Sequence, residues 1–162
     1  MQFYSTNRKT SPVSLREAVV RGLAADRGLF MPEVIRRFPP AFYQNMKEMT
    51  LREISFVVAE AFFGEDVEAG KLKEIVDETL NFDIPLVQVA DNRYSLELFH
   101  GPTLAFKDVG ARFMARLLAY FNKQEGERQV NVLVATSGDT GSAVANGFLD
   151  VPGAVSYTHL TL

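Results

Sequence analysis

The stretch VNVLVATSGDTGSAVANGFL, residues 130–149, decides the fold of this chain. Residues 130–135 are nearly all apolar or β-branched, which predicts a strand buried on both faces of a sheet. The turn TSGDTG follows directly, and residues 142–149 have the composition of a helix. A strand, a glycine-rich turn and a helix in this order predict the start of a βα unit in a parallel sheet.

The turn at 136–141 is a candidate anion-binding site. Free backbone N–H groups at a helix N-terminus attract anions, and glycines let a ligand approach the backbone closely. The hydroxyl groups of Ser137 and Thr140 would add donors, at the end of the strand where open α/β sheets place their ligands. An ordinary turn with a Ser, Asp or Thr cap is an equally open interpretation. The turn matches neither the dinucleotide-binding nor the ATP-binding glycine pattern.

A second candidate is HGPTLAFKD, residues 100–108, ahead of an amphipathic helix predicted to end near Phe121. Lys107 lies at the start of that helix, after three apolar residues. The positive end of the helix dipole and partial burial both disfavour an ammonium there. A neutral lysine amine is the nucleophile that a Schiff base requires. Composition alone favours the alternative, a solvated lysine beside a simple first-turn acid, Asp108, because lysines are mostly exposed.

The residues before this region predict a mostly helical lobe. Two S/T-x-x-E capping boxes, Ser14 with Glu17 and Thr50 with Glu53, indicate helix starts. Helices are expected at 14–23, 51–63 and 67–80, and apolar residues also repeat at helical spacing between 38 and 49. Strands are expected at 85–89 and 94–99, around a turn at Asp91-Asn92. We therefore predict an α/β protein with a helical N-terminal domain at 1–90 and an α/β domain beginning at 91–153.

Composition excludes several classes of function. The chain has 162 residues, 47% of them hydrophobic, and a formal net charge of -3. With a small negative net charge and scattered charged residues, the chain has no basic surface for nucleic acid. Its apolar runs are too short to span a membrane, so no membrane partner is expected. Cysteine is absent, which suits a cytoplasmic protein and rules out thiolate metal sites. The two histidines, His100 and His159, have no partners at metal-ligand spacing.

Three segments together resemble threonine synthase of the longer bacterial and fungal type. They are SLREAVVRGLAADRGLFMP at 14–32, LELFHGPTLAFKDVGARFMA at 96–115 and VLVATSGDTGSAVANGF at 132–148. HGPTLAFKD is the most specific of these motifs, whereas related enzymes carry loops like SGDTG. The resemblance implies a fold-type II pyridoxal-phosphate enzyme, in which a tryptophan-synthase-β-like parallel-sheet domain follows the helical lobe. Such enzymes run to several hundred residues, so this chain is expected to be a truncated N-terminal portion.

The resemblance also implies a reaction and a set of site residues. The family converts O-phosphohomoserine and water to L-threonine and phosphate, with pyridoxal 5'-phosphate as electron sink. Lys107 would form the Schiff base and transfer the proton. Phe106 and His100 would shape the pocket, and Arg112 is a weaker candidate for contacting substrate phosphate. The substrate carboxylate would be held by the loop Ser137, Gly138, Asp139, Thr140 and Gly141, with Asp139 also near the phenolic oxygen of the cofactor.

Other functions stay open on sequence alone. Another fold-type II lyase, such as a dehydratase or a sulfhydrylase, usually carries a different sequence around the lysine and lacks the GLAADRGLF segment. A non-catalytic homologue could bind phosphorylated ligands through the SGDTG loop. The remaining alternative is an α/β domain of some other role.

The last residues, AVSYTHLTL at 154–162, do not fit a second buried parallel strand. A strand covered on both faces calls for continuous Val, Ile and Leu, whereas polar residues recur here. We predict a non-native tail over 154–162, and the alternative is an edge strand. Because a sheet of one or two parallel strands has open edges and poorly covered faces, we also predict a partly exposed, aggregation-prone product with weak or no catalysis.

Overall fold

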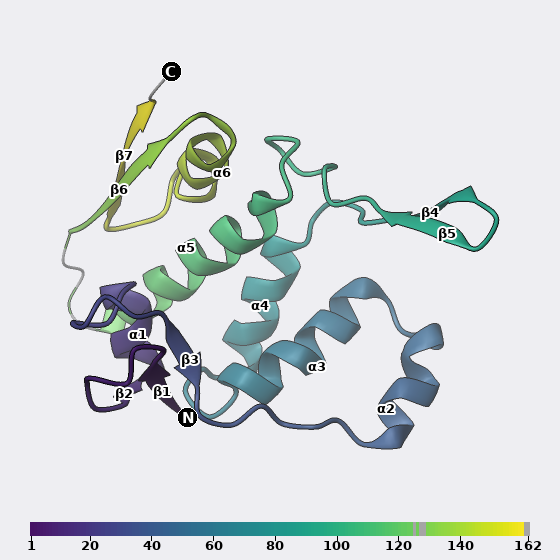
Figure 1. Ribbon diagram of the computed structural model, residues 1–162, viewed down its shortest axis with the longest axis horizontal. Coiled ribbons are helices and arrows are strands. Elements are labelled where there is room, and N and C mark those ends of the chain that lie inside the picture. The colour runs from purple at the N-terminus through teal and green to yellow at the C-terminus, as the bar shows by residue number, and fades with distance from the viewer. Residues whose placement is uncertain (125, 127–128, 161–162) are drawn as a thin grey trace. The chain divides into compact units, whose positions relative to one another are not determined.

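The computed structural model describes residues 1–124, 126 and 129–160, which form two compact units, Met1–Asp77 and Glu78–Leu162 (Figure 1). The division at 1–90 and 91–153 expected from sequence remains a prediction about domains. In chain order the elements are β1 (Gln2–Ser5), β2 (Val13–Ser14), α1 (Leu15–Arg21), β3 (Phe30–Pro32), α2 (Pro40–Asn45), the 3-10 helix η1 (Met46–Glu48), α3 (Leu51–Phe63), α4 (Ala69–Thr79), β4 (Leu86–Ala90), β5 (Arg93–Leu96), α5 (Lys107–Gln124), β6 (Val130–Thr136), α6 (Asp139–Gly147) and β7 (Ala154–Leu160).

The capping motifs begin helices where the sequence predicts. The Thr50 hydroxyl accepts from the N–H of Glu53 at 3.3 Å, and the Glu53 carboxylate accepts from the N–H of Thr50 at 2.7 Å, which completes the capping box of α3. At α1 the Ser14 hydroxyl accepts from the N–H of Glu17. Helix α1 ends at Arg21, earlier than expected, because Gly22 takes a φ of 71° that a helix cannot continue.

The first unit also contains a small antiparallel sheet, ordered β2-β1-β3, that the sequence analysis missed. These strands have two to four residues each. Such runs are too short to show a period-2 pattern. The mostly helical N-terminal lobe therefore also contains a sheet. The apolar side chains of Leu72, Ile75 and Val76 on α4 are buried, as is that of Leu80 just after it.

Asp26 holds this sheet to the GLAADRGLF turn. Its carboxylate accepts from the hydroxyl of Ser5 at 2.6 Å, and from the backbone N–H groups of Gly28 at 3.0 Å and Lys9 at 2.9 Å. Ser5 is fully buried, and its hydroxyl also accepts from the N–H of Asn7. The ionised carboxylate thus serves several donors from two separate chain segments, and protonation would weaken these bonds.

We expect acid to weaken the first unit through Asp26. The hydrogen bond from Ser5, followed by those from Gly28 and Lys9, lowers the pKa of Asp26 below its ordinary value of 3.8. Because the folded-state pKa is the lower one, the stabilisation is present above the unfolded pKa and is lost as pH falls through the folded pKa. An Asp26→Asn variant should be less stable at neutral pH and lose less stability between neutral pH and acid.

Urea unfolding at a series of pH values measures this difference. Asp83→Asn, at an exposed position of the second unit, controls for the loss of one carboxylate. Equal acid sensitivity of wild type and Asp26→Asn would contradict the prediction.

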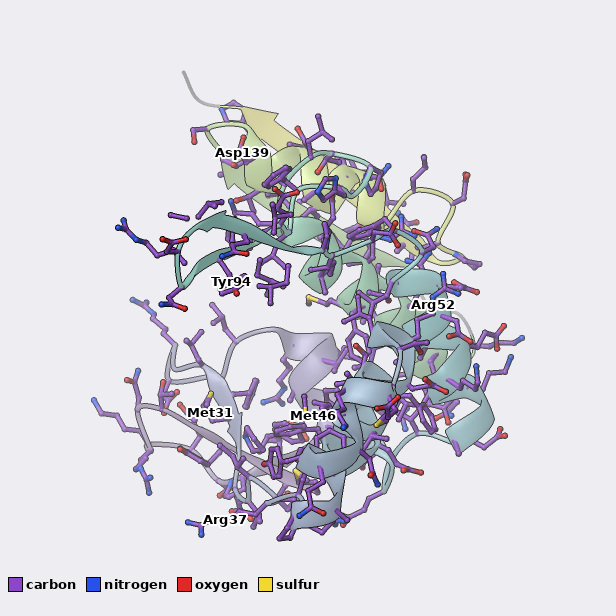
Figure 2. The ribbon with its side chains drawn as sticks, turned by 90° about the vertical axis from the view of Figure 1, so that its right-hand side faces the viewer. Met31, Arg37, Met46, Arg52, Tyr94 and Asp139 are labelled. Carbon is purple, nitrogen blue, oxygen red and sulfur yellow. The ribbon has the colours of Figure 1, made fainter. Side chains whose placement is uncertain are left out.

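In the second unit, β4 and β5 form an antiparallel hairpin with Asn92 at φ 56° in its turn. Positive φ is unusual outside glycine but is tolerated by asparagine, as the sequence turn at Asp91-Asn92 predicts. The apolar side chains of this hairpin are exposed, including those of Leu86, Val89, Tyr94 and Leu96. Tyr94 is labelled in Figure 2, on the outer part of the hairpin.

Strand β6, helix α6 and strand β7 form the predicted βαβ unit. The two strands pair in parallel from Val130 opposite Ala154 to Thr136 opposite Leu160. Helix α6 lies along one side of the pair (Figure 1). The expectation that β6 is buried on both faces is wrong, because its residues alternate and Leu133 is 78% exposed on the uncovered face. Among the described residues, a helix covers only one face of the β6–β7 pair. This agrees with the prediction that the faces of so small a sheet are poorly covered.

Helix α6 also begins earlier than predicted, at Asp139 instead of residue 142. Gly138, at φ 149° and ψ -73°, makes the reversal from β6 by itself. An L-residue with a side chain rarely adopts that conformation. The rest of the glycine-rich turn is therefore the first turn of the helix, so its backbone N–H groups point out of a helix N-terminus.

Residues 154–160 adopt the strand geometry of the edge-strand alternative, while residues 161 and 162 lie outside the described part of the chain. One feature fits a foreign segment instead. The hydroxyl of Ser156 is buried and has no hydrogen-bond partner among the described residues. A native parallel strand would place an apolar side chain there. The non-native origin of this tail remains a prediction.

We expect Ser156→Val to stabilise the 162-residue chain by about 1–2 kcal/mol, because it removes an unsatisfied buried hydroxyl and adds apolar contact. Thr158→Val, at an exposed position of the same strand, should change stability little. The midpoint of urea unfolding measures both variants. A destabilised Ser156→Val would show that this hydroxyl finds a partner in solution.

Candidate functional site

Lys107 is the first residue of α5, as the sequence predicts. Its side chain is partly buried, and its Nζ lies 4.6 Å from the centroid of the Phe106 ring. Within the described part of the chain, the Nζ makes no hydrogen bond or ion pair. An ammonium on a solvated surface commonly pairs with a carboxylate, as Lys71 and Lys73 do on α4. Lys107 therefore has a nucleophilic atom that no neighbouring acid holds.

The loop before Lys107 carries His100 and Phe106, the two residues expected to shape the pocket. Nε2 of His100 lies 2.7 Å from Oε2 of Glu97, and the imidazole stacks on the Phe99 ring with centroids 4.8 Å apart. This His100–Glu97 pair is a finding of the structure. Phe106 is 61% exposed. A large exposed aromatic ring next to an unpaired amine provides an apolar wall for a planar ligand.

Arg112 is already engaged in holding the fold. Its Nη2 donates to the backbone carbonyl of Glu78 at 2.7 Å, and Arg116 donates from Nε to the Glu78 carboxylate at 2.6 Å. Burial, and then the neighbouring Arg116, lower the pKa of Arg112 from its ordinary value. Cations often bind the last carbonyls of a helix, which explains this contact at the end of α4. The geometry weakens the expectation that Arg112 is free to bind phosphate.

The N-terminus of α6 has no side-chain cap. Gly138 occupies the cap position, its own N–H donates to the hydroxyl of Thr136 at 3.2 Å, and the first helical bond runs from Ser142 N–H to Gly138 carbonyl. The capped-turn alternative is therefore not what the structure forms. The N–H groups of Asp139, Thr140 and Gly141 come before that first bond, which makes this end suited to an anion such as a carboxylate.

Side chains around this N-terminus differ in exposure. Ser137 and Asp139 are exposed, Thr140 is partly buried and Gly141 is buried. Asp139 is labelled in Figure 2 at the start of α6. A negative side chain in the first turn interacts favourably with the helix dipole, but it competes with a bound anion for the same positive end. The backbone N–H groups and the hydroxyls, more than Asp139, are thus the donors available to a carboxylate.

Helices α5 and α6, which begin at the two candidate sites, pack directly on each other. A Cβ added to Gly147 would lie 2.9 Å from the backbone carbon of Ala111, so the helices approach to a distance that only glycine permits. No hydrogen bond, ion pair or ring contact within the described residues joins Lys107 to residues 137–141. The structure brings the two candidate elements into one packed unit without direct contact between their functional groups.

One pair of residues near Lys107 was missed by sequence reasoning. Asp108, considered there only as a simple first-turn acid, is fully buried and binds both the hydroxyl and the N–H of Thr103. The only available signal was a threonine five residues before an acid at a loop-to-helix junction, which is too common to be diagnostic. Among the described residues, no cluster of three His, Asp or Glu side chains could hold a metal ion, and no helix is long and apolar enough to cross a membrane.

Comparison with known proteins gives a consistent result. Residues 2–80 match the family model described as "Threonine synthase N terminus". Threonine synthase of Serratia marcescens is 41% identical over 148 residues, which cover 91% of this chain and 34% of that protein. The crystal structure of Escherichia coli threonine synthase superposes with a TM-score of 0.88 at 37% identity, covering 98% of this chain and 36% of that one.

A structure of threonine synthase with bound pyridoxal phosphate, from Brucella melitensis, superposes with a TM-score of 0.91 at 34% identity. The superposed region is 98% of this chain and 35% of the Brucella melitensis chain. The chain thus spans about a third of the length of the relatives that it matches. Sequence and structure agree over nearly all of it, and the chain is a mixed α/β homologue of the N-terminal region of threonine synthases.

Proposed function

We propose that the complete protein, with this chain as its N-terminal portion, is a pyridoxal-phosphate-dependent lyase that converts O-phosphohomoserine and water to L-threonine and phosphate. The observation that carries the proposal is Lys107, an unpaired amine at the first position of α5 beside the exposed ring of Phe106. The parallel β6-α6-β7 unit supports a fold-type II, tryptophan-synthase-β-like domain.

The residues present fit pyridoxal phosphate. Bound there, the cofactor would supply an aldehyde for an amine and a ring that withdraws electrons. The Nζ of Lys107 would hold it covalently, and Phe106 would lie against it. Among the described residues no carboxylate pairs with the Nζ, so the amine is available to the cofactor aldehyde.

In the proposed reaction each residue of the chain has a limited task. The N–H groups at the start of α6 and the hydroxyls of Ser137 and Thr140 would orient the substrate carboxylate. The Nζ of Lys107 would take up and return the proton, since a neutral amine serves as a general base. His100, already oriented by Glu97, would border the site. Asp139 would face the phenolic oxygen of the cofactor, and Arg112 is the least favoured of the proposed substrate contacts.

The test uses the complete gene product that contains these residues. After incubation with pyridoxal phosphate and borohydride reduction, peptide mapping should place the label on Lys107, and O-phosphohomoserine should yield threonine and phosphate. Label at Lys107 with turnover of a different substrate would favour a dehydratase or a sulfhydrylase. Absence of label, with phosphate ligands still bound, would favour a non-catalytic binding protein and overturn the proposal.

A further inference from the structure

Asp108 is a buried carboxylate that the proposed reaction does not use. It is 0% exposed, although aspartate is almost never fully buried without a partner. No Lys, Arg or His side chain among the described residues forms an ion pair with it. Its two carboxylate oxygens accept hydrogen bonds from Thr103 in the preceding loop, and its charge also interacts with the guanidinium of Arg112 without forming an ion pair.

Both carboxylate oxygens of Asp108 are engaged by Thr103. Oδ2 accepts from the backbone N–H of Thr103 at 2.9 Å, and Oδ1 accepts from the hydroxyl at 2.5 Å. Gly101 lies against the same carboxylate, because an added Cβ would be 2.5 Å from Oδ2 and 3.0 Å from the ring of Phe82. The loop backbone is therefore packed onto Asp108 at two points, and a side chain at residue 101 would separate them.

The hydrogen bonds between Asp108 and Thr103, called the clamp below, hold the loop before α5. The loop needs them because its large apolar side chains are not buried in the core. Leu104 has a φ of 58°, which is strained for a leucine, and its side chain is 74% exposed. The backbone bonds from Leu104 N–H to Gly101 carbonyl and from Asp108 N–H to Ala105 carbonyl close the turn. A strained loop without buried side chains persists only when neighbouring bonds over-determine it.

We propose that Asp108 is a positioning residue for Lys107. The Asp108 carboxylate fixes the loop that leads into α5. Lys107 lies directly between that loop and Asp108, so the hydrogen bonds to Thr103 also fix the backbone on both sides of Lys107. Asp108 touches neither substrate nor cofactor in this proposal, and acts by holding the Nζ of Lys107 and the Phe106 ring where the cofactor aldehyde is presented. The inference rests on the proposed function of Lys107.

The test compares three variants of the complete gene product. Thr103→Val removes only the hydroxyl donor, Asp108→Asn removes the charge, and Thr103→Ser keeps the hydroxyl and serves as the conservative rescue. The rate of covalent trapping of pyridoxal phosphate at Lys107 by borohydride is the readout. Thr103→Val and Asp108→Asn should slow trapping by about 10- to 100-fold, the effect of a small displacement of a reacting group, while Thr103→Ser stays near wild type.

Circular dichroism at the trapping temperature separates positioning from unfolding. If Asp108→Asn does not fold, the milder Thr103→Val decides the matter. Wild-type trapping rates in folded Thr103→Val would overturn the inference, as would an equal loss in Thr103→Ser or a loss that merely follows the unfolded fraction. A wild-type protein that is not trapped at Lys107 at all would instead overturn the proposed function, and this inference with it.

Discussion

Replacing Lys107 with alanine in the complete gene product is expected to abolish covalent trapping of pyridoxal phosphate and to slow threonine formation by at least about 10²- to 10⁴-fold, the contribution of proton transfer alone. The physical reason is that Lys107 would provide both the covalent link and the proton-transferring group. Phosphate release from O-phosphohomoserine and peptide mapping after borohydride reduction measure the two effects.

Two further variants interpret that result. Lys107→Arg keeps a long cationic side chain, but a guanidinium stays protonated and cannot act as the nucleophile, so it should be as inactive as Lys107→Ala. Lys123→Ala removes an exposed lysine in the last turn of the same helix and should leave activity unchanged. Substantial activity in Lys107→Arg would show that another residue carries the chemistry.

Gly28→Ala is expected to destabilise the first unit by about 2–4 kcal/mol through overpacking and loss of a buried hydrogen bond. A Cβ at Gly28 would overlap the hydroxyl of Ser5, and it would lie 2.9 Å from the backbone nitrogen of Asn7. Ser5 is fully buried, so it cannot move aside without breaking its bond to Asp26. Urea unfolding of the 162-residue chain at low concentration, followed by circular dichroism, measures the loss.

The same substitution at Gly110 provides a control of opposite sign. Gly110 is exposed within α5, and an added Cβ there would meet nothing within 4 Å. Alanine in a helix interior should therefore stabilise by about 0.5–1 kcal/mol. If Gly28→Ala were as harmless as Gly110→Ala, the packing of the Ser5–Asp26 contact would differ in solution.

The helices of this chain could be predicted because their signals are local. The Thr50–Glu53 capping box lies within one turn, and the apolar residues of α4 repeat at helical spacing. The three short strands β1, β2 and β3 could not be predicted in this way. They are held by pairing with one another and by Asp26, which binds donors more than fifteen residues away, and no local pattern contains that information.

For the candidate site, the sequence by itself determined the residue types and their places on the elements: Lys107 at a helix start, and glycines between β6 and α6. The tertiary structure alone decided how these residues are held. Asp108, which the sequence indicates only as a first-turn acid, is buried and accepts hydrogen bonds from Thr103, and Arg112 is engaged with the carbonyl of Glu78. The reason is physical, because local patterns fix backbone conformation, whereas the partner of a polar side chain is fixed by whichever group the folded chain brings within hydrogen-bond distance.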